Sequence, residues 1–171
     1  MITTNEHMFK GGSVKDANKL VCLGIDPGTP KSRVGLCVWD GDKILEITTI
    51  NGEKIYEKLL DYKRDGIIDV VGVEVSTSTH IYSRPGVSPR GMLKIAQNVS
   101  ANRCAALQII IYIQNLGLEV VQVEPKNTKM DPLLFQKITG YTKRCSSHAR
   151  DAWGIARRTY AEVYFKSRIK E

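Results

Sequence analysis

Short apolar runs separated by turn-forming residues dominate the first third of the chain. Residues 19–26 and 33–40 are two such runs, and the segment DPGTPKS that separates them is typical of a turn. A third run, residues 43–50, follows the turn Asp40-Gly41-Asp42 and alternates apolar with polar positions, as an edge strand with one wet face does. Three consecutive strands of this kind predict an antiparallel meander.

Helical and strand-like patterns alternate through the rest of the chain. Apolar residues have helical spacing within residues 51–65, and the nearly continuous apolar run at 67–75 predicts a strand covered on both faces. The later patterns predict, in chain order, a long helix at 88–115, a strand at 118–123, a short helix at 130–139 and a terminal helix at 147–169. Apart from the short helix at 130–139, the order is βββαβαβα, which predicts an α/β domain with a mixed five-stranded sheet flanked by helices.

The length and composition are those of one globular domain. The 171 residues are 42% hydrophobic and 25% charged, which is enough apolar material for an ordinary core. We expect this domain to span residues 20–171, after a flexible polar arm at 1–19. No apolar run approaches the roughly 20 residues of a membrane span. We expect the scattered cysteines to be reduced core residues in a cytoplasm-like compartment, and they are Cys22, Cys37, Cys104 and Cys145.

Basic residues are concentrated late in the sequence. Lys and Arg exceed Asp and Glu by 25 to 18, yet residues 1–74 hold 10 basic and 12 acidic side chains. Residues 75–118 contain no carboxylate, and residues 126–171 hold 11 basic against 4 acidic side chains. This distribution indicates a polyanionic partner such as nucleic acid, because basic groups near phosphates release condensed counterions. A solvated basic surface would explain the charge alone equally well.

Two carboxylates lie at the ends of predicted strands. Asp26 closes the first strand and Glu74 lies near the end of the fourth, each after apolar residues that draw the backbone into the core. A buried carboxylate is costly unless it is paired, and a divalent metal is the strongest partner. Taken singly, each could instead be satisfied by a turn or by a lysine.

His148 and Asp151 stand three residues apart at the start of the terminal helix and should share one face of it. Both side chains can bind metals. Asp151 also suits the first turn of a helix capped by Ser147, and a lone His148 also suits a surface position. If this helix packs across the strand ends, three carboxylates and one imidazole converge. Such a set fits Mg²⁺ or Mn²⁺, and the imidazole favours Mn²⁺ slightly.

Several motifs occur in a fixed order: LGIDPGTPKSRVGLCV, VVGVEV, an Ala-Gln pair in the long helix, EPKNTK and SSHARDAWGIA. Together they resemble the successive motifs of RuvC-type Holliday junction resolvases, and the HARDA ending is similar to that of bacteriophage members. The resemblance runs from about residue 20 to the C-terminus. It implies an RNase H-like nuclease domain that cuts branched DNA. It is also compatible with a phage-encoded enzyme that acts in a bacterial cytoplasm.

The resemblance also implies roles for individual residues. The acidic quartet of the family transfers to Asp26, Glu74, His148 and Asp151, and His148 stands where the family pattern has an aspartate. Lys129 takes the place of a lysine close to the scissile phosphate. Two Mg²⁺ or Mn²⁺ ions about 4 Å apart would flank one phosphodiester, leaving 5′-phosphate and 3′-hydroxyl ends. No nucleotide cofactor is implied.

The acid-free segment 76–90 is rich in hydroxyls, Pro, Gly and Arg, which predicts a mobile substrate loop. Resolvases place an aromatic residue here that wedges into the junction, and His80 and Tyr82 are the candidates for this stacking role. We expect basic side chains to line the DNA path, together with the bases of the last helix: Arg84, Arg90, Lys126 and Lys129.

We predict a homodimer, because a two-fold symmetric junction needs paired nicks and a domain of this size has room for one active site. The helix at 88–115 is the candidate interface, since its isoleucines face several sides: Ile109, Ile110, Ile111 and Ile113. Burial of this helix within the monomer is an equally good explanation of the pattern.

Three other functions fit parts of the sequence. GIDPGT also resembles the first phosphate loop of actin-like and sugar kinases, but those proteins need two such domains and an adenosine site. A different RNase H-like nuclease, acting on RNA–DNA hybrids or on RNA, would share the metal chemistry. A non-catalytic nucleic-acid-binding module would have lost one or more of the acids, whereas every site position here is filled.

Overall fold

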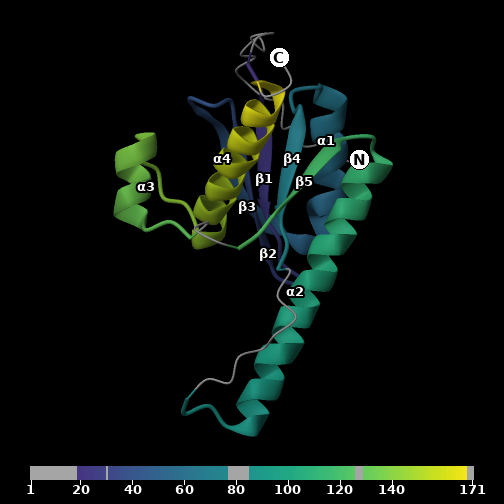
Figure 1. Ribbon diagram of the computed structural model, residues 1–171, viewed down its shortest axis with the longest axis vertical. Coiled ribbons are helices and arrows are strands. Elements are labelled where there is room, and N and C mark those ends of the chain that lie inside the picture. Colours follow the sequence, from purple (N-terminus) through teal and green to yellow (C-terminus); the bar gives the residue numbers. More distant parts are fainter. Residues whose placement is uncertain (1–18, 30, 77–84, 126–128, 169–171) are drawn as a thin grey trace, which may run out of the picture.

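A five-stranded sheet forms the centre of the protein in this computed structural model, which describes residues 19–29, 31–76, 85–125 and 129–168 (Figure 1). The strand order is β3-β2-β1-β4-β5. The strands are β1 (Cys22–Asp26), β2 (Arg33–Trp39), β3 (Ile44–Asn51), β4 (Val70–Glu74) and β5 (Glu119–Val123). The first three pair antiparallel, whereas β4 and β5 run parallel to β1. The predicted α/β class, the meander and the edge position of the third strand are therefore confirmed.

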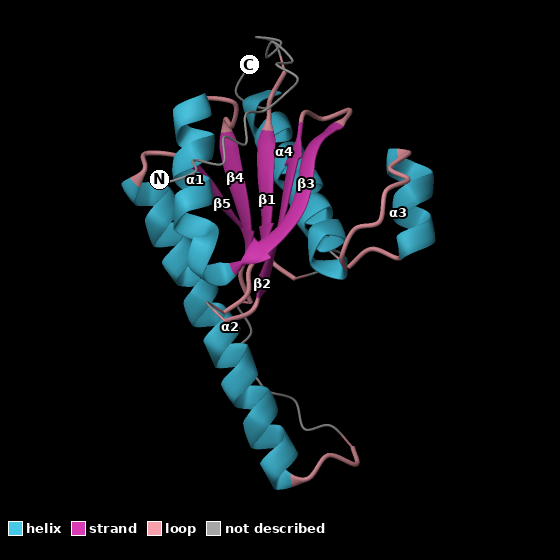
Figure 2. Cartoon of the chain, turned by 180° about the vertical axis from the view of Figure 1, so that it is seen from behind, coloured by secondary structure: helices cyan, strands magenta, loops and turns pink. Residues whose placement is uncertain are grey.

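Helices cover both faces of this sheet (Figures 1 and 2). One face carries α1 (Ile55–Asp65), which follows the 3₁₀ turn η1 (Gly52–Lys54), and the long helix α2 (Pro89–Asn115). The other face carries α4 (Ser147–Arg168). The short helix α3 (Pro132–Thr139) stands to the side of α4 and buries only Phe135.

The central strand β1 is buried on both faces. Leu23 and Ile25 belong to the large core with α1 and α2, while Cys22 packs with Ala156 of α4. Successive side chains of a strand point to opposite faces, so a strand between two helical layers needs apolar residues at nearly every position. This burial explains why the sequence shows an unbroken apolar run here.

Glycines let α4 lie directly on the backbone of the sheet. Gly35 of β2 and Gly24 of β1 face this helix, and a Cβ atom at either would collide with it, at the carbonyl oxygens of His148 and Ala152 respectively. Gly72 of β4 plays the same part further along α4. Gly35 pairs with Asp26 in the β1–β2 register, so the close contact fixes the first turn of α4 beside Asp26.

The long helix α2 is divided between core and surface. Its C-terminal half packs on the sheet and buries Ile109, Ile110 and Ile113, whereas Ile111 is 47% exposed. Its N-terminal half projects beyond the body of the domain (Figure 2). Three of the four isoleucines predicted for a dimer interface therefore lie in the core of the monomer.

Predictions based on composition have mixed outcomes. All four cysteines are free, but Cys104 is exposed on α2 and is not a core residue. Within the part of the chain that the structure describes, no helix is both long and apolar enough to cross a membrane. Residues 1–18 of the expected polar arm lie outside the described residues.

Candidate active site

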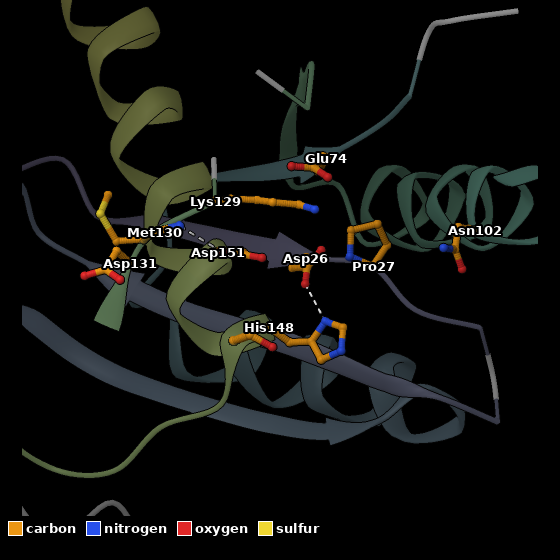
Figure 3. Close-up of a pocket in the computed structure, with 10 residues that line it drawn as sticks. Asp26, Pro27, Glu74, Asn102, Lys129, Met130, Asp131, His148 and Asp151 are labelled. Carbon is orange, nitrogen blue, oxygen red and sulfur yellow. Dashed lines mark hydrogen bonds and ion pairs between the residues drawn. The ribbon is translucent and has the colours of Figure 1, made fainter. Parts of the chain in front are cut away.

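A cavity of about 570 Å³ opens where β1 and β4 end, beneath the first turn of α4 (Figure 3). The structure gathers around it five residues that the sequence singled out, namely Asp26, Glu74, Lys129, His148 and Asp151. The remaining lining residues are Pro27, Asn102, Met130, Asp131 and Ser147. The roles assigned to the five residues stay predictions, but their meeting in one cavity is a property of the fold.

Strand pairing places the first two carboxylates together. β1 and β4 are adjacent and parallel, with Ile25 opposite Val73, so Asp26 and Glu74 end neighbouring strands at the same edge of the sheet. An antiparallel arrangement would have put them at opposite edges. The parallel crossover through α1 is therefore what creates this pair.

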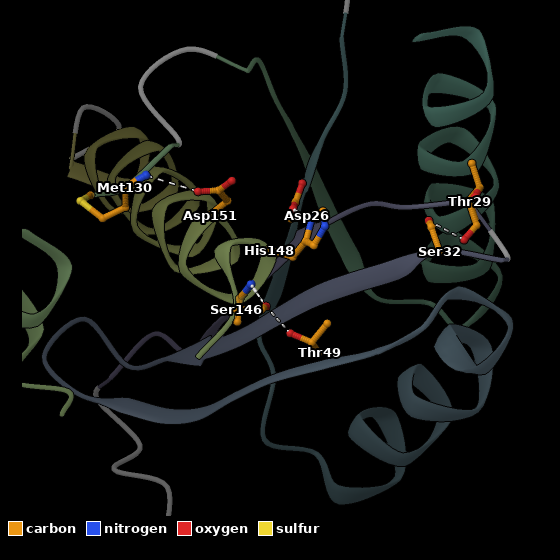
Figure 4. A network of polar contacts seen from close by, with 9 residues as sticks. Asp26, Thr29, Ser32, Thr49, Met130, Ser146, His148 and Asp151 are labelled. Carbon is orange, nitrogen blue, oxygen red and sulfur yellow. Dashed lines mark hydrogen bonds and ion pairs between the residues drawn. The ribbon is translucent and has the colours of Figure 1, made fainter. Parts of the chain in front are cut away.

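A hydroxyl pair fixes the start of α4 (Figure 4). Ser146 accepts a hydrogen bond from the N–H of Ala149 at 3.1 Å, and its Oγ atom lies 2.6 Å from Oγ1 of Thr49 on β3. Ser146 is thus the N-terminal cap, and the expectation that Ser147 would cap this helix was wrong by one residue. Ser147 lines the cavity.

His148 and Asp26 contact each other directly. Nδ1 of the imidazole lies 2.6 Å from Oδ2 of the carboxylate, in a pair whose Asp26 side chain is 14% exposed and whose His148 side chain is 47% exposed. An ionised carboxylate only accepts hydrogen bonds, so Nδ1 donates and Nε2 is left as the second nitrogen of the ring. A carboxylate bound in this way orients a histidine for ligation through its other nitrogen.

Burial and two neighbouring carboxylates make the ionised form of Asp26 costly. Burial raises the pKa of Asp26 from the usual 3.8 to about 6; the His148 hydrogen bond opposes this rise, and the charges of Glu74 and Asp151 add to it. Three carboxylates are therefore close enough to repel one another across the cavity. A cation placed among them would relieve that repulsion.

The donor set suits a hard divalent cation, because it offers carboxylate oxygens and one imidazole nitrogen. Among the described residues, however, no three acidic, histidine or cysteine side chains already form a cluster that could hold a metal ion. Ligation by all four predicted residues would therefore require their side chains to draw together.

Lys129 enters the cavity from the loop that follows β5 (Figure 3). The next peptide is held by α4, because the N–H of Met130 donates to Oδ1 of Asp151 at 3.3 Å. This bond links a candidate metal ligand to the residue beside the candidate catalytic lysine.

Two further lining residues, Asn102 and Asp131, were not predicted from the sequence. Asn102 stands on α2, where a single polar residue on an exposed helix surface has no distinguishing pattern. Asp131 is explained locally as the cap of α3, since its carboxylate accepts from the N–H groups of Leu133 and Leu134 at 2.9 and 3.1 Å. Only the fold shows that both residues face the same cavity as Asp26.

The predicted DNA-contacting residues are only partly placed. Arg90 lies in the first turn of α2 and is exposed, and it does not line the cavity. The other candidates apart from Lys129 fall outside the described residues, and they are His80, Tyr82, Arg84 and Lys126.

The fold is similar to solved RuvC structures, although no protein-family model matches the sequence and no curated protein matches it. T. thermophilus RuvC in complex with Holliday junction substrate superimposes with a TM-score of 0.56 at 20% identity, over 84% of this chain and 96% of that chain. A further Thermus thermophilus RuvC structure superimposes with a TM-score of 0.53 at 18% identity, over 85% of this chain and 97% of that chain. The chain therefore has a RuvC-like, RNase H-like fold.

Proposed function

We propose that this protein is a metal-dependent endonuclease that resolves four-way DNA junctions by paired symmetric nicks, which leave 5′-phosphate and 3′-hydroxyl ends. The observation that carries the proposal is the cavity where Asp26, Glu74, His148 and Asp151 meet on a RuvC-like fold. The basic later part of the sequence supports a nucleic acid as the substrate. One RuvC neighbour was solved with a Holliday junction substrate.

The site would hold two Mg²⁺ or Mn²⁺ ions through the three carboxylates and the imidazole of His148. When bound, such ions supply Lewis-acid activation of water and stabilisation of the departing 3′ oxygen. Asp26, whose side chain is only 14% exposed, would anchor the site. The ammonium group of Lys129 would stabilise negative charge on the scissile phosphate.

The DNA path would extend from the cavity along basic side chains. Lys129 supports this proposal by lining the cavity, and Arg90 would reach an outer arm of the substrate because it stands on the projecting end of α2. By residue type alone, Arg84 and Lys126 would add phosphate contacts, and His80 or Tyr82 would stack on a base at the junction.

A homodimer would supply the second nick. The exposed apolar residues of α2 include Leu93, Leu107 and Ile111, which are 60%, 42% and 47% exposed. Their spacing of 14 and 4 residues puts them on one line of the helix, so a second copy could cover all three at once. We propose this stripe as the interface, in place of the buried isoleucines.

The test is a cleavage assay with a four-way junction, a linear duplex of matched sequence and an RNA–DNA hybrid, each with Mg²⁺, Mn²⁺ or chelator. We expect paired nicks in the junction with either metal, and no cleavage by Asp26→Asn, while Asp131→Asn serves as the control carboxylate of the same cavity. Equal cleavage of duplex and junction would refute junction selectivity. Preferred cleavage of the hybrid would favour the alternative nuclease, and binding without cleavage would indicate a non-catalytic module.

A further inference from the structure

Arg150 belongs to the HARDA segment but has no part in the proposed chemistry. It precedes Asp151 on α4 and is half-buried. Its Nε atom donates to the carbonyl oxygen of Met130 at 3.4 Å, and its Nη1 atom donates to the carbonyl oxygen of Cys145 at 3.1 Å. Two of its donor groups are therefore directed at the backbone of the loops on either side of α3.

Arg150 and Asp151 together hold both polar backbone groups of Met130. The N–H group is bound by the Asp151 carboxylate and the carbonyl group by the Arg150 guanidinium. Met130 also packs against the small core that contains Phe135 and Trp153. The residue that follows Lys129 is thus fixed in position by consecutive residues of one helix.

The two hydrogen bonds to the Met130 backbone matter because Lys129 itself is exposed and has a long, flexible side chain. The backbone position sets which part of the cavity the ammonium group can reach. A displacement of about 1 Å in a reacting group is enough to reduce catalysis by about 100-fold. Fixing the Met130 peptide is therefore a direct way to place Lys129 against the acids.

We propose that Arg150 is a positioning residue that acts on phosphodiester cleavage through Lys129, by holding the carbonyl group of Met130. The proposal rests on the proposed nuclease function. This role differs from long-range attraction of DNA by positive charge, because the guanidinium of Arg150 donates hydrogen bonds to the backbone carbonyls of Met130 and Cys145.

The test is a double-mutant cycle on single-turnover cleavage of a four-way junction. Lys129→Met should lower the rate by about 100-fold, as expected for removal of one electrostatic contact at the reacting group. Arg150→Met should lower it by about 10-fold or more in the wild-type background, but by less than about 2-fold in the Lys129→Met background. Arg64→Met is the matched control, because Arg64 is an exposed arginine of α1 that pairs with Asp61 at 3.0 Å and does not line the cavity.

A second readout needs neither metal nor DNA. Hydrogen exchange in the metal-free protein should become faster at the Met130 amide in Arg150→Met, while exchange in the core strand β1 stays as in the wild type. Additive effects in the cycle, or unchanged exchange at Met130, would overturn the proposal. If Arg150→Met does not fold, Arg150→Gln replaces it, and unfolding of both would show a core structural role and overturn the proposal as well. Absence of cleavage by the wild-type protein would instead refute the nuclease function.

Discussion

Replacing Asp26 by asparagine should stabilise the metal-free protein while abolishing cleavage. Burial, supported by the charges of Glu74 and Asp151, raises the pKa of Asp26 from 3.8 to about 6. The side chain is only 14% exposed, so solvent screens this effect weakly. A difference of one in pKa corresponds to about 1.4 kcal/mol, so the rise from 3.8 to about 6 means that the ionised carboxylate destabilises the folded state by about 3 kcal/mol.

The pH dependence follows from the direction of this change. Between about pH 4 and pH 6 the folded protein holds a proton that the unfolded chain releases, so the contribution of Asp26 to stability decreases as the pH rises through that window. Asp26→Asn removes the ionisation and keeps the shape. We expect it to raise the free energy of unfolding by about 2–3 kcal/mol at pH 8 and by little at pH 4.

The assay is urea unfolding at pH 8 and pH 4 with chelator present. Asp131→Asn is the matched control, since its carboxylate lines the same cavity but is exposed, and asparagine is an equally good helix cap. Its stability should change by less than about 0.5 kcal/mol at both pH values. An Asp26→Asn protein that is no more stable than the wild type at pH 8 would refute the reasoning.

Magnesium extends the same experiment. A ligand that binds only the folded state at ten times its dissociation constant adds about 1.4 kcal/mol of stability. The wild type should gain this amount at pH 8, and Asp26→Asn should gain almost none because it lacks the central carboxylate. Equal stabilisation of both proteins would show that Asp26 does not bind the ion.

Three further changes test the site and the assembly. Gly35→Ala should destabilise the fold by about 1–3 kcal/mol in urea unfolding and reduce cleavage, because the added Cβ would collide with the carbonyl oxygen of His148. Unchanged stability would contradict the close packing of α4 on β2. His148→Ala should lose most cleavage activity in metal titrations, while His148→Asp should keep it and reduce the advantage of Mn²⁺ over Mg²⁺; wild-type activity in His148→Ala would exclude a ligand role. Leu107→Glu should give a monomer in sedimentation with single instead of paired nicks, whereas Leu60→Glu, at an exposed site on α1, should stay dimeric; a dimer in both would place the interface elsewhere.

The five strands were predictable because each has a simple pattern of buried and exposed residues. Where the observed end of a strand differs from the predicted one, the cause is a local interaction. The apolar run at 67–75 predicted a longer fourth strand than β4, which begins at Val70. Asp69 stands just before it and accepts a hydrogen bond from the N–H of Val21 at 2.8 Å. The Asp69 carboxylate thus binds a backbone N–H group that would otherwise bond to a neighbouring strand. A pattern of apolar residues cannot reveal such a side-chain hydrogen bond.

The long helix shows a limit of periodicity. Apolar residues on several sides of α2 fit either a covered helix or a dimer, and the sequence left both open. The structure assigns Ile109 and Ile113 to the core and leaves Leu107 and Ile111 outside. Which side faces the sheet depends on the crossover that precedes α2, and this is tertiary information that a helical pattern does not contain.

Asp40 and Asp26 both lie at strand ends, but their pKa values shift in opposite directions. Asp40 follows β2 and fits the ordinary explanation: burial acts to raise its pKa, but hydrogen bonds from the N–H groups of Lys43 and Asp42 outweigh it, so the pKa of Asp40 is lowered. Asp26 ends β1, and burial, with smaller contributions from the charges of Glu74 and Asp151, raises its pKa despite the hydrogen bond from His148. A carboxylate kept in a place that disfavours its charge reduces stability, and such groups concentrate at functional sites. The sequence already named Asp26 as a candidate ligand, and the parallel β1–β4 pairing and the contact of α4 with Gly35 explain why this strand-end acid lies among the other ionisable groups of the cavity.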